Sequence, residues 1–262
     1  MQPLTALVGK AGEAIMAERR AGMAVRAKAD RSPVTAADEA AEAVLLEGLA
    51  RLMPGVPVVS EEQVAAGHAP ALGDVFVLVD PLDGTREFVD GHDEFTVNVA
   101  VIVAGAPVAG LVGVPAQARI WRGLAGGGAE RVVGELGTPI RARLWPGAEA
   151  VGLASRSHLD PASAALLARL GLTPTPCGSA LKFCRLAEGA ADVYARLAPT
   201  SQWDIAAGHA VLAAAGGVVA CPDGSNISYG DGGTRGAAPR FGVPAFVACG
   251  DPALLPMLVD TP

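Results

Sequence analysis

The sequence predicts an α/β protein whose N-terminal half is of the α+β kind and whose C-terminal half is of the α/β kind. In the first half, apolar residues at helical spacing are followed by apolar runs of strand length. After about residue 150, short apolar runs alternate with helical patterns, which is typical of α/β units. Over 262 residues, 51% hydrophobic against 18% charged residues indicates a large buried core.

Two helices and four strands are predicted for the first half. Apolar residues recur at helical spacing over residues 4–15 and again over 41–52. Thr35, with Asp38 three residues later, is the pattern of an N-terminal helix cap. Strands are expected at residues 56–60, 75–79, 95–103 and 108–114, and the last two form a hairpin around Ala104-Gly105-Ala106-Pro107.

The second half is predicted to alternate strands and helices. Its expected helices cover residues 160–171, 179–188 and 204–216, with a short helix near the C-terminus. Its expected strands cover residues 150–154, 173–176, 192–195, 218–220 and 245–249. We place the boundary at residues 135–148, which predicts a helix-and-antiparallel-sheet domain over 1–140 and an α/β domain over 141–262.

Charge and cysteine usage restrict the partners. The net charge of −7 argues against a nucleic-acid polymer or an anionic membrane surface, because both require a cationic face. The longest apolar stretches are strand-sized, so no membrane span is expected. The four cysteines form no C-x-x-C pair and follow no secretory leader, which predicts a cytoplasmic protein with cysteines packed in the core.

The stretch "LVDPLDGTREF", residues 78–88, places acidic residues at the end of a predicted buried strand. Asp80 ends this strand, and the turn through Pro81-Leu82-Asp83-Gly84 directs Asp83 and a loop carbonyl toward the same crevice. Two such carboxylates repel each other, and a hard divalent cation neutralises them. The alternative is that Asp-Gly is simply a common turn dipeptide.

Further acids occupy similar positions. Glu61 and Glu62 follow another predicted strand, and Asp204 stands after Gln202-Trp203 where a helix is expected to begin. Each has a local alternative: Glu61 and Glu62 as solvated loop charges, and Asp204 as a helix cap. Spacing alone leaves both interpretations open.

Four stretches carry a resemblance to a known family: "SPVTAADEAAE" (32–42), "VVSEEQVAAG" (58–67), "VDPLDGTREFVDGHDEFTVNVAVI" (79–102) and "WDIAAGHAVLAAAGG" (203–217). In order and spacing they resemble the inositol-monophosphatase superfamily of lithium-sensitive, magnesium-dependent phosphatases. The resemblance covers nearly the whole chain, and D-P-x-D-G-T followed by a distant W-D is a highly specific motif. It implies the layered αβαβα sandwich of the sugar phosphatases.

Other stretches resemble one branch of that superfamily, the 3'(2'),5'-bisphosphate nucleotidases. These are Arg86-Glu87-Phe88 and Glu94-Phe95-Thr96-Val97-Asn98, together with "ASRSH" (154–158), "GSALKFCRLAEGAADVYAR" (178–196) and "PTSQWD" (199–204). Enzymes of this branch remove the 3'-phosphate from 3'-phosphoadenosine 5'-phosphate and from its 5'-phosphosulfate analogue. The resemblance implies the same activity here, in sulfur assimilation.

The resemblance also implies a set of metal ligands. Glu61, Asp80 and the carbonyl of Leu82 would hold one Mg²⁺, and Asp80, Asp83 and Asp204 a second, with two or three ions per site. Most ligands then lie in the first predicted domain, and Asp204 and the substrate-binding residues in the second. Carboxylates and substrate phosphate are the ligands that Mg²⁺ prefers.

Three residues take catalytic roles by the same resemblance. Thr85 matches the position whose hydroxyl orients the attacking water, and Asp38 matches the aspartate that accepts from that hydroxyl. A threonine hydroxyl has no useful basicity by itself, so it needs this acceptor. Glu61 is a candidate base. For Asp38 the alternative is the helix cap, and the two roles are compatible.

The substrate-binding residues follow in the same way. Gly84 and Thr85 are expected to offer backbone N–H groups to the phosphate, beside Asp204. The positions that match family contacts to the 5'-phosphate or the nucleoside are Ser157, His158, Ser179, Lys182 and Arg196. The alternative is that the basic ones are solvated ends of helices, strands and loops. Trp203, Phe88 and Phe95 are expected in the core.

Two further functions stay open. A phosphatase acting on inositol-1-phosphate or fructose-1,6-bisphosphate would use the same metal site, since fold does not decide specificity. A catalytically silent metal- or nucleotide-binding protein is the other alternative. Gln202, where the branch often has an acid, and the glycine-rich stretch "GSNISYGDGGTRGAAPRFGVPAF" depart from the family pattern and bear on substrate preference. A homodimer is compatible with the superfamily.

Overall fold

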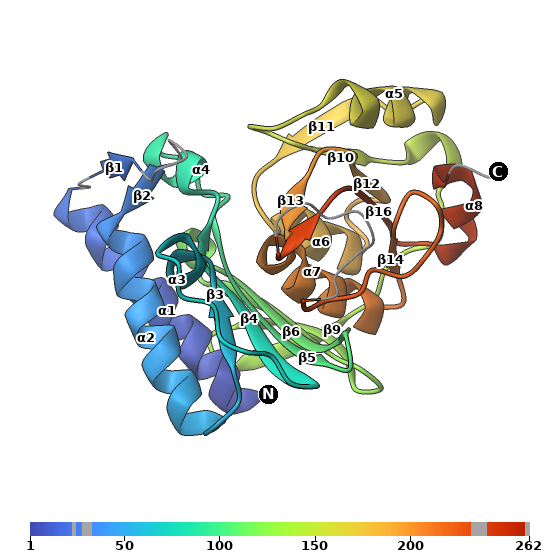
Figure 1. The fold of residues 1–262 in the computed structure, drawn as a ribbon. Helices are drawn as coiled ribbons and strands as arrows, with labels where there is room; N and C mark the ends of the chain where they lie inside the picture. Colours follow the sequence, from blue (N-terminus) through green and yellow to red (C-terminus); the bar gives the residue numbers. More distant parts are fainter. Residues whose placement is uncertain (23–24, 28–32, 232–239, 260–262) are drawn as a thin grey trace.

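The computed structural model describes residues 1–22, 25–27, 33–231 and 240–259. Helices and sheets alternate in an αβαβα arrangement, as predicted, from the α1–α2 pair to α5 and α8 at the opposite side (Figure 1). Residue 32 of the first family-like stretch and residues 232–239 of the glycine-rich stretch lie outside the described residues.

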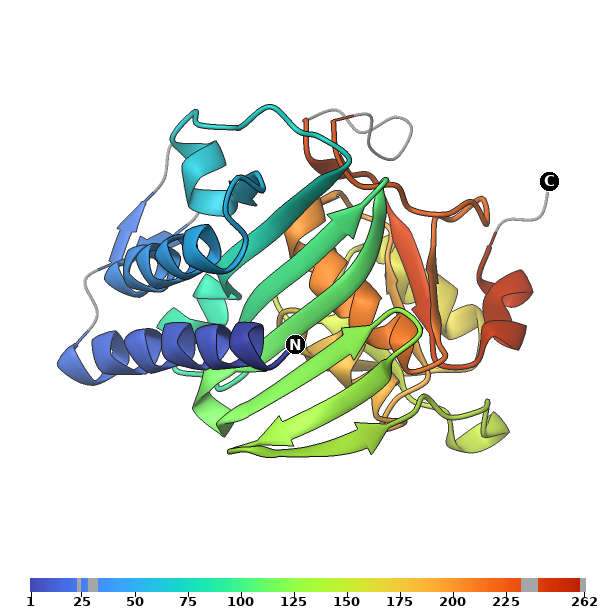
Figure 2. The same cartoon turned by 90° about the horizontal axis from the view of Figure 1, so that it is seen from below.

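The first layer consists of α1 (Gln2–Ala21) and α2 (Ala36–Leu52), which lie side by side across one face of the large sheet (Figure 2). The predicted cap of α2 is confirmed. The Ala37 N–H donates to Thr35 Oγ1 at 3.1 Å, and the Thr35 N–H donates to Asp38 Oδ2 at 2.7 Å. This capping box satisfies backbone donors that the helix itself leaves open.

The second layer is a seven-stranded sheet whose spatial order follows the chain. Only the first pair is parallel. Side chains alternate across the sheet, so Val77 and Val79 pack against α1 and α2 while Phe76 and Leu78 face the rest of the molecule. The strands are β3 (Val58–Ser60), β4 (Val75–Asp83), β5 (Thr96–Val103), β6 (Ala106–Val114), β7 (Arg119–Leu124), β8 (Gly128–Val133) and β9 (Leu136–Ile140).

This sheet differs from the prediction in two places. Strand β4 continues to Asp83 instead of ending at Asp80, and its pairing with β5 shifts register between Asp80 and Asp83. Strands β7, β8 and β9 were not predicted. They are short, carry polar residues and are partly exposed, so they lack the apolar runs that marked the buried strands. The predicted hairpin is confirmed, with Ala104 and Gly105 at its turn.

The remaining layers belong to the second half. Helices α6 (Leu181–Ala187) and α7 (Gln202–Ala214) lie between the two sheets, and α5 (Pro161–Arg169) and α8 (Leu255–Leu258) cover the outer face of the second sheet. That sheet has the order β11-β10-β12-β16-β14. Its strands are β10 (Gly152–Ser155), β11 (Pro174–Cys177), β12 (Val193–Arg196), β14 (Val218–Ala220) and β16 (Phe246–Cys249).

The predicted elements of this half are all present within a few residues. Short elements that were not predicted complete the fold. These are β1 (Val25–Ala27), β2 (Pro33–Thr35), α3 (Glu61–Ala65), α4 (Thr85–Val89), β13 (Thr200–Ser201), β15 (Gly242–Val243), and the 3-10 turns η1 (Pro115–Gln117), η2 (Gly147–Glu149) and η3 (Pro252–Leu254).

The largest hydrophobic core joins the two halves. Trp121 of β7 belongs to it together with Phe183 of α6 and Tyr194 of β12. Helix α7 approaches the large sheet at Gly110, where a Cβ would meet the Ala207 carbonyl oxygen at 2.3 Å. The division into domains at residue 140 stays a prediction. It falls in the connection between β9 and β10.

Two expectations about surface and core can be compared with this fold. The four cysteines are buried free thiols, which confirms the prediction that they pack in the core. In the described part of the chain, no helix combines the length and apolarity needed to cross a membrane.

Candidate active site

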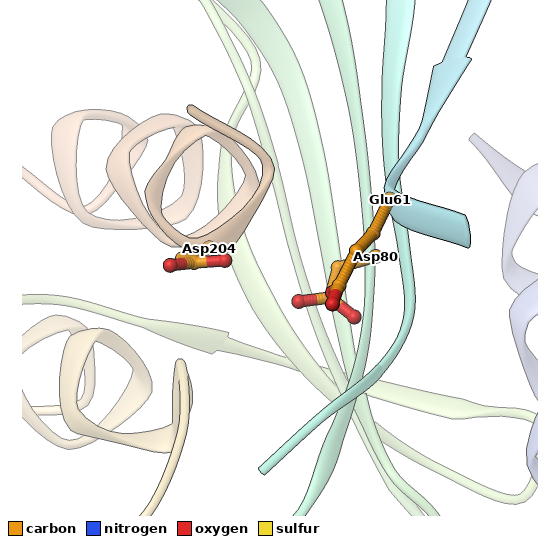
Figure 3. A group of neighbouring side chains, drawn as sticks. All are labelled: Glu61, Asp80 and Asp204. Carbon is orange, nitrogen blue, oxygen red and sulfur yellow. The ribbon is translucent and has the colours of Figure 1, made fainter. Parts of the chain in front are cut away.

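Three of the predicted acids converge from distant parts of the chain. One carboxylate oxygen from each of Glu61, Asp80 and Asp204 lies within 4.8 Å of the other two. Figure 3 shows Glu61 and Asp80 beside each other, with Asp204 at the start of α7 across from them. Glu61 is the first residue of α3, directly after β3, and Asp80 lies beside it because β3 and β4 are parallel neighbours.

Asp204 also caps its helix, as the local alternative predicted. Its Oδ2 accepts from the Ser201 N–H at 3.0 Å and from the Thr200 hydroxyl. These bonds fix the carboxylate at the first turn of α7 and leave Oδ1 for other contacts. Capping and membership of the acidic cluster therefore coexist in Asp204.

The cluster is electrostatically unfavourable without a cation. Asp80 is 1% exposed, and burial raises its pKa well above the usual value, with Glu61, Asp83 and Asp204 adding repulsion. Burial and the nearby Asp204 raise the pKa of Asp83 to about 6, although Lys182 opposes the shift. Clustered carboxylates with raised pKa values are the arrangement that a bound divalent cation relieves.

Asp83 lies next to this cluster but outside its tightest group. Its Oδ2 accepts from the Ala180 N–H at 2.6 Å and from Thr96 Oγ1 and Asn98 Nδ2, both at 3.3 Å. The same side chain lines the pocket above the acids. All three hydrogen bonds end on the same carboxylate oxygen. Asp83 therefore links the large sheet to the turn before α6.

Thr85, Asp38 and Leu82 meet at one point. Thr85 Oγ1 lies 3.3 Å from Asp38 Oδ1 and 3.2 Å from the Leu82 carbonyl oxygen, and its single proton has both acceptors within reach. Asp38 and Leu82 are each 1% exposed, whereas Thr85 lines the pocket. Gly84 precedes it with φ of +87°, a left-handed conformation that favours glycine.

Basic groups line the same pocket as the acids. Arg86, His158, Lys182 and Arg196 are all among its lining residues. Arg86 Nη1 lies 2.9 Å from His158 Nε2. Burial, followed by the charges of Arg196 and Arg86, lowers the pKa of His158, which keeps its imidazole neutral near pH 7. Among the described residues, the buried Arg196 Nε has no hydrogen-bond partner.

Lys182 differs from the other basic residues. It is 2% exposed, and its ammonium donates to the carbonyl oxygens of Ser179 at 2.6 Å and Cys177 at 3.2 Å. It also lies 4.9 Å from the ring centre of Tyr194. The alternative of a solvated helix end is therefore wrong for Lys182, and much of its hydrogen-bonding capacity is used inside the protein.

Of the two serines predicted to contact the substrate, one lines the pocket and the other does not. Ser179 lines the pocket, whereas Ser157 is not among the lining residues and donates to Glu87 Oε1 at 2.7 Å. Trp203, Phe88 and Phe95 are buried, as predicted. Sequence reasoning singled out neither Glu87 nor Glu94 as site residues. Both lie in the stretches 86–88 and 94–98 that resemble the nucleotidase branch, and this resemblance was the sequence feature that could have indicated them.

The donor set fits a hard cation. The converging atoms are carboxylate oxygens, with the Leu82 carbonyl nearby through its contact with Thr85. Within the described residues, the buried oxygens Ser60 Oγ and Asn98 Oδ1, next to Glu61 and Asp83, lack a protein hydrogen-bond partner. Unpartnered buried oxygens beside the acids are positions that a metal ion or its bound waters would satisfy.

The chain belongs to the inositol monophosphatase family, which its sequence matches over residues 2–247. It is 42% identical to the 3'(2'),5'-bisphosphate nucleotidase CysQ of Escherichia coli K12 over 234 residues, 85% of this chain and 91% of that protein. It is 35% identical to the histidinol-phosphatase of Mycobacterium tuberculosis, covering 75% of this chain and 77% of that one.

A solved structure agrees with this family relationship. The crystal structure of CysQ from Bacteroides thetaiotaomicron, a bacterial member of the inositol monophosphatase family, superimposes with a TM-score of 0.71. Its sequence is 31% identical, and the match covers 93% of this chain and 94% of that chain. The predicted family and sandwich fold are thereby confirmed.

Proposed function

We propose that this protein is a magnesium-dependent 3'(2'),5'-bisphosphate nucleotidase. It would convert 3'-phosphoadenosine 5'-phosphate to AMP and phosphate, and the phosphosulfate analogue to adenosine 5'-phosphosulfate and phosphate. The observation that carries the proposal is a single pocket that is lined by Glu61, Asp83 and Asp204 and also by Arg86 and Arg196. The 42% sequence identity to the CysQ nucleotidase of Escherichia coli K12, over 85% of this chain, supports it.

The acidic residues of the pocket would carry the hydrolysis. Glu61, Asp80, Asp83, Asp204 and the Leu82 carbonyl would hold Mg²⁺, in two or three ions, which neutralises phosphate charge and makes water more acidic when bound. The Thr85 hydroxyl donates toward Asp38 Oδ1 and the Leu82 carbonyl oxygen, so that its own oxygen would accept a hydrogen bond from the attacking water and orient it.

The reacting phosphate needs hydrogen-bond donors close to these acids. Gly84 and Thr85 line the pocket at the start of α4, where their backbone N–H groups can receive phosphate oxygens. The positive φ of Gly84 and the absence of a side chain allow this close approach. Asp204 and Glu61 complete the wall around the scissile ester. Glu61 is the candidate base for the water.

The basic residues of the pocket would receive the 5'-phosphate. Arg196, with its unpartnered Nε, and Arg86 are the guanidinium groups in the pocket, and such groups bind phosphate through paired N–H donors. His158 would donate through its protonated nitrogen while Arg86 occupies Nε2. Ser157, Ser179 and Lys182 would hold this wall, with Lys182 acting mainly through the carbonyls that it binds.

The test is a comparison of kcat/KM with Mg²⁺ for 3'-phosphoadenosine 5'-phosphate, inositol-1-phosphate and fructose-1,6-bisphosphate. We expect a preference for the nucleotide of about 100-fold, or about 2.7 kcal/mol. An Asp83→Asn variant is the control that removes metal-dependent turnover. Equal or faster turnover of a sugar phosphate would overturn the branch, and intact esters throughout would support a silent binding protein.

Location and assembly are parts of the same proposal. We expect a cytoplasmic enzyme, because its reduced, buried thiols suit that compartment. Light scattering at several protein concentrations would test for the homodimer that is compatible with the superfamily.

A further inference from the structure

Glu94 receives hydrogen bonds from two separate loops of the second half. Its Oε2 accepts from Arg156 Nε at 3.0 Å and Nη2 at 2.8 Å, and from the Gly178 N–H at 2.8 Å. Its backbone oxygen accepts from Ser179 Oγ at 2.6 Å. Its side chain is 26% exposed, so these bonds are partly shielded from water. One residue thus fastens the loop after β10 and the loop after β11.

These loops form part of the wall of the pocket that the acids also line. Ser155 and His158 of the first loop and Ser179 of the second are lining residues. Glu94 itself belongs to the first half, between α4 and β5. Its contacts therefore set the distance between a wall built by the second half and the acids carried mostly by the first.

The anchor point is rigid. Phe95, the next residue, is fully buried and packs edge-on against Phe88 at 5.0 Å between ring centres. The contact with Gly178 is also close, since a Cβ at Gly178 would lie 2.7 Å from the Glu94 carbonyl oxygen. Ser179 follows in a left-handed conformation with φ of +45°, which costs energy for a non-glycine residue. The bonds to Glu94 offset that cost.

We propose that Glu94 is a positioning residue that holds the 155–158 and 177–180 loops at the spacing required by the distal part of a two-phosphate substrate. This inference rests on the proposed nucleotidase function for its substrate, but the contacts themselves are independent of it. Glu94 is neither one of the clustered acids nor a lining residue of the pocket. Its loss should therefore weaken binding of the distal group more than the chemical step.

The experiment compares Glu94→Ala with Asp93→Ala, a matched loss of a neighbouring carboxylate. Asp93 is 64% exposed and pairs with Arg19 instead of the two loops. For 3'-phosphoadenosine 5'-phosphate, we expect Glu94→Ala to raise KM about tenfold while kcat stays within about threefold. For p-nitrophenyl phosphate, which has no second phosphate, kcat/KM should stay within about threefold of wild type in both variants.

Two further variants resolve the contacts. Arg156→Ala removes only the first loop's bonds and should raise KM less than Glu94→Ala. Glu94→Gln keeps an acceptor for the Gly178 N–H but loses the charge that pairs with Arg156. This variant replaces Glu94→Ala in the kinetic comparison if Glu94→Ala fails to fold. Hydrogen exchange measured on the metal-loaded protein should become faster in peptides containing 155–158 and 177–180 for Glu94→Ala, but not for Asp93→Ala.

The outcomes separate this proposal from the proposed function. Equal losses on both substrates, or unchanged exchange in both loops, would overturn the positioning role. A wild-type enzyme without activity on the nucleotide would overturn the function, and exchange in the two loops would then decide the role of Glu94. Faster exchange would support that role and unchanged exchange would refute it.

Discussion

Thr85 Oγ1 lies 3.3 Å from Asp38 Oδ1, although 47 positions separate the two residues. The other oxygen of the same carboxylate accepts from the Thr35 N–H at 2.7 Å and closes the start of α2. One buried side chain thus caps a helix and reaches a pocket-lining hydroxyl. The capping and catalytic interpretations of Asp38 are compatible in this geometry.

Asp38→Asn should separate these roles. Asparagine still accepts at the cap, so we expect the unfolding free energy to fall by about 1 kcal/mol or less. The weaker acceptor at Oδ1 should lower kcat about 100-fold or more, in the range of general acid–base contributions. Steady-state kinetics and urea unfolding on the same preparation measure both effects. A kcat within about threefold of wild type would leave Asp38 as a cap only.

Magnesium should stabilise the fold through the acidic cluster. The repulsion around Asp80 is relieved when a cation binds, and a ligand at 100 times its dissociation constant adds about 2.7 kcal/mol. Glu61→Gln removes one of the repelling charges, so its metal-free Tm should equal or exceed that of wild type. Its gain in Tm on adding Mg²⁺ should be smaller. The same gain in both proteins would contradict a metal site at Glu61.

Gly110→Ala should loosen α7, which carries Asp204. A Cβ at Gly110 would meet the Ala207 oxygen at 2.3 Å and the Ala210 Cβ at 2.7 Å, contacts that force the helix away from the sheet. We expect a loss of about 2 to 3 kcal/mol in unfolding free energy. The matched control is Gly73→Ala, because nothing lies within 4 Å of a Cβ there. Equal stability of the two variants would refute the close packing.

His209 should make stability fall in mild acid. Burial lowers its pKa from 6.5 to about 4, and its Nδ1 lies 2.9 Å from the Tyr229 hydroxyl. The unfolded chain therefore binds the proton more readily, so this stabilisation is complete above pH 6.5 and is lost as pH falls toward 4.

The variant His209→Gln isolates this effect. Between pH 7.5 and 5, wild type should lose about 2 kcal/mol more unfolding free energy than the variant, both measured by denaturant titration at one Mg²⁺ concentration. Parallel losses in the two proteins would show that His209 is not held neutral in the fold.

Elements with a strong local pattern were predictable. The cap at Thr35 and the hairpin turn at Ala104-Gly105 both depend on residues close in the chain, and both are present. The strands β7, β8 and β9 were missed because half-exposed antiparallel strands with arginine and glutamate lack an apolar run. Their place is decided by pairing, of β7 with β6, of β8 with β7 and of β9 with β8, and not by the residues of each strand alone.

The sequence by itself determined the acidic motif, the family and the order of most elements, because these reside in residue type and in spacing along the chain. Only the tertiary structure decided which atoms meet. The distances from Glu61 to Asp204, from Asp83 to the Ala180 N–H and from Glu94 to Arg156 depend on how α7 and the loops after β10 and β11 pack against the large sheet. Lys182 shows the reason: its charge is evident from the sequence, but close packing buries it and commits it to two carbonyls.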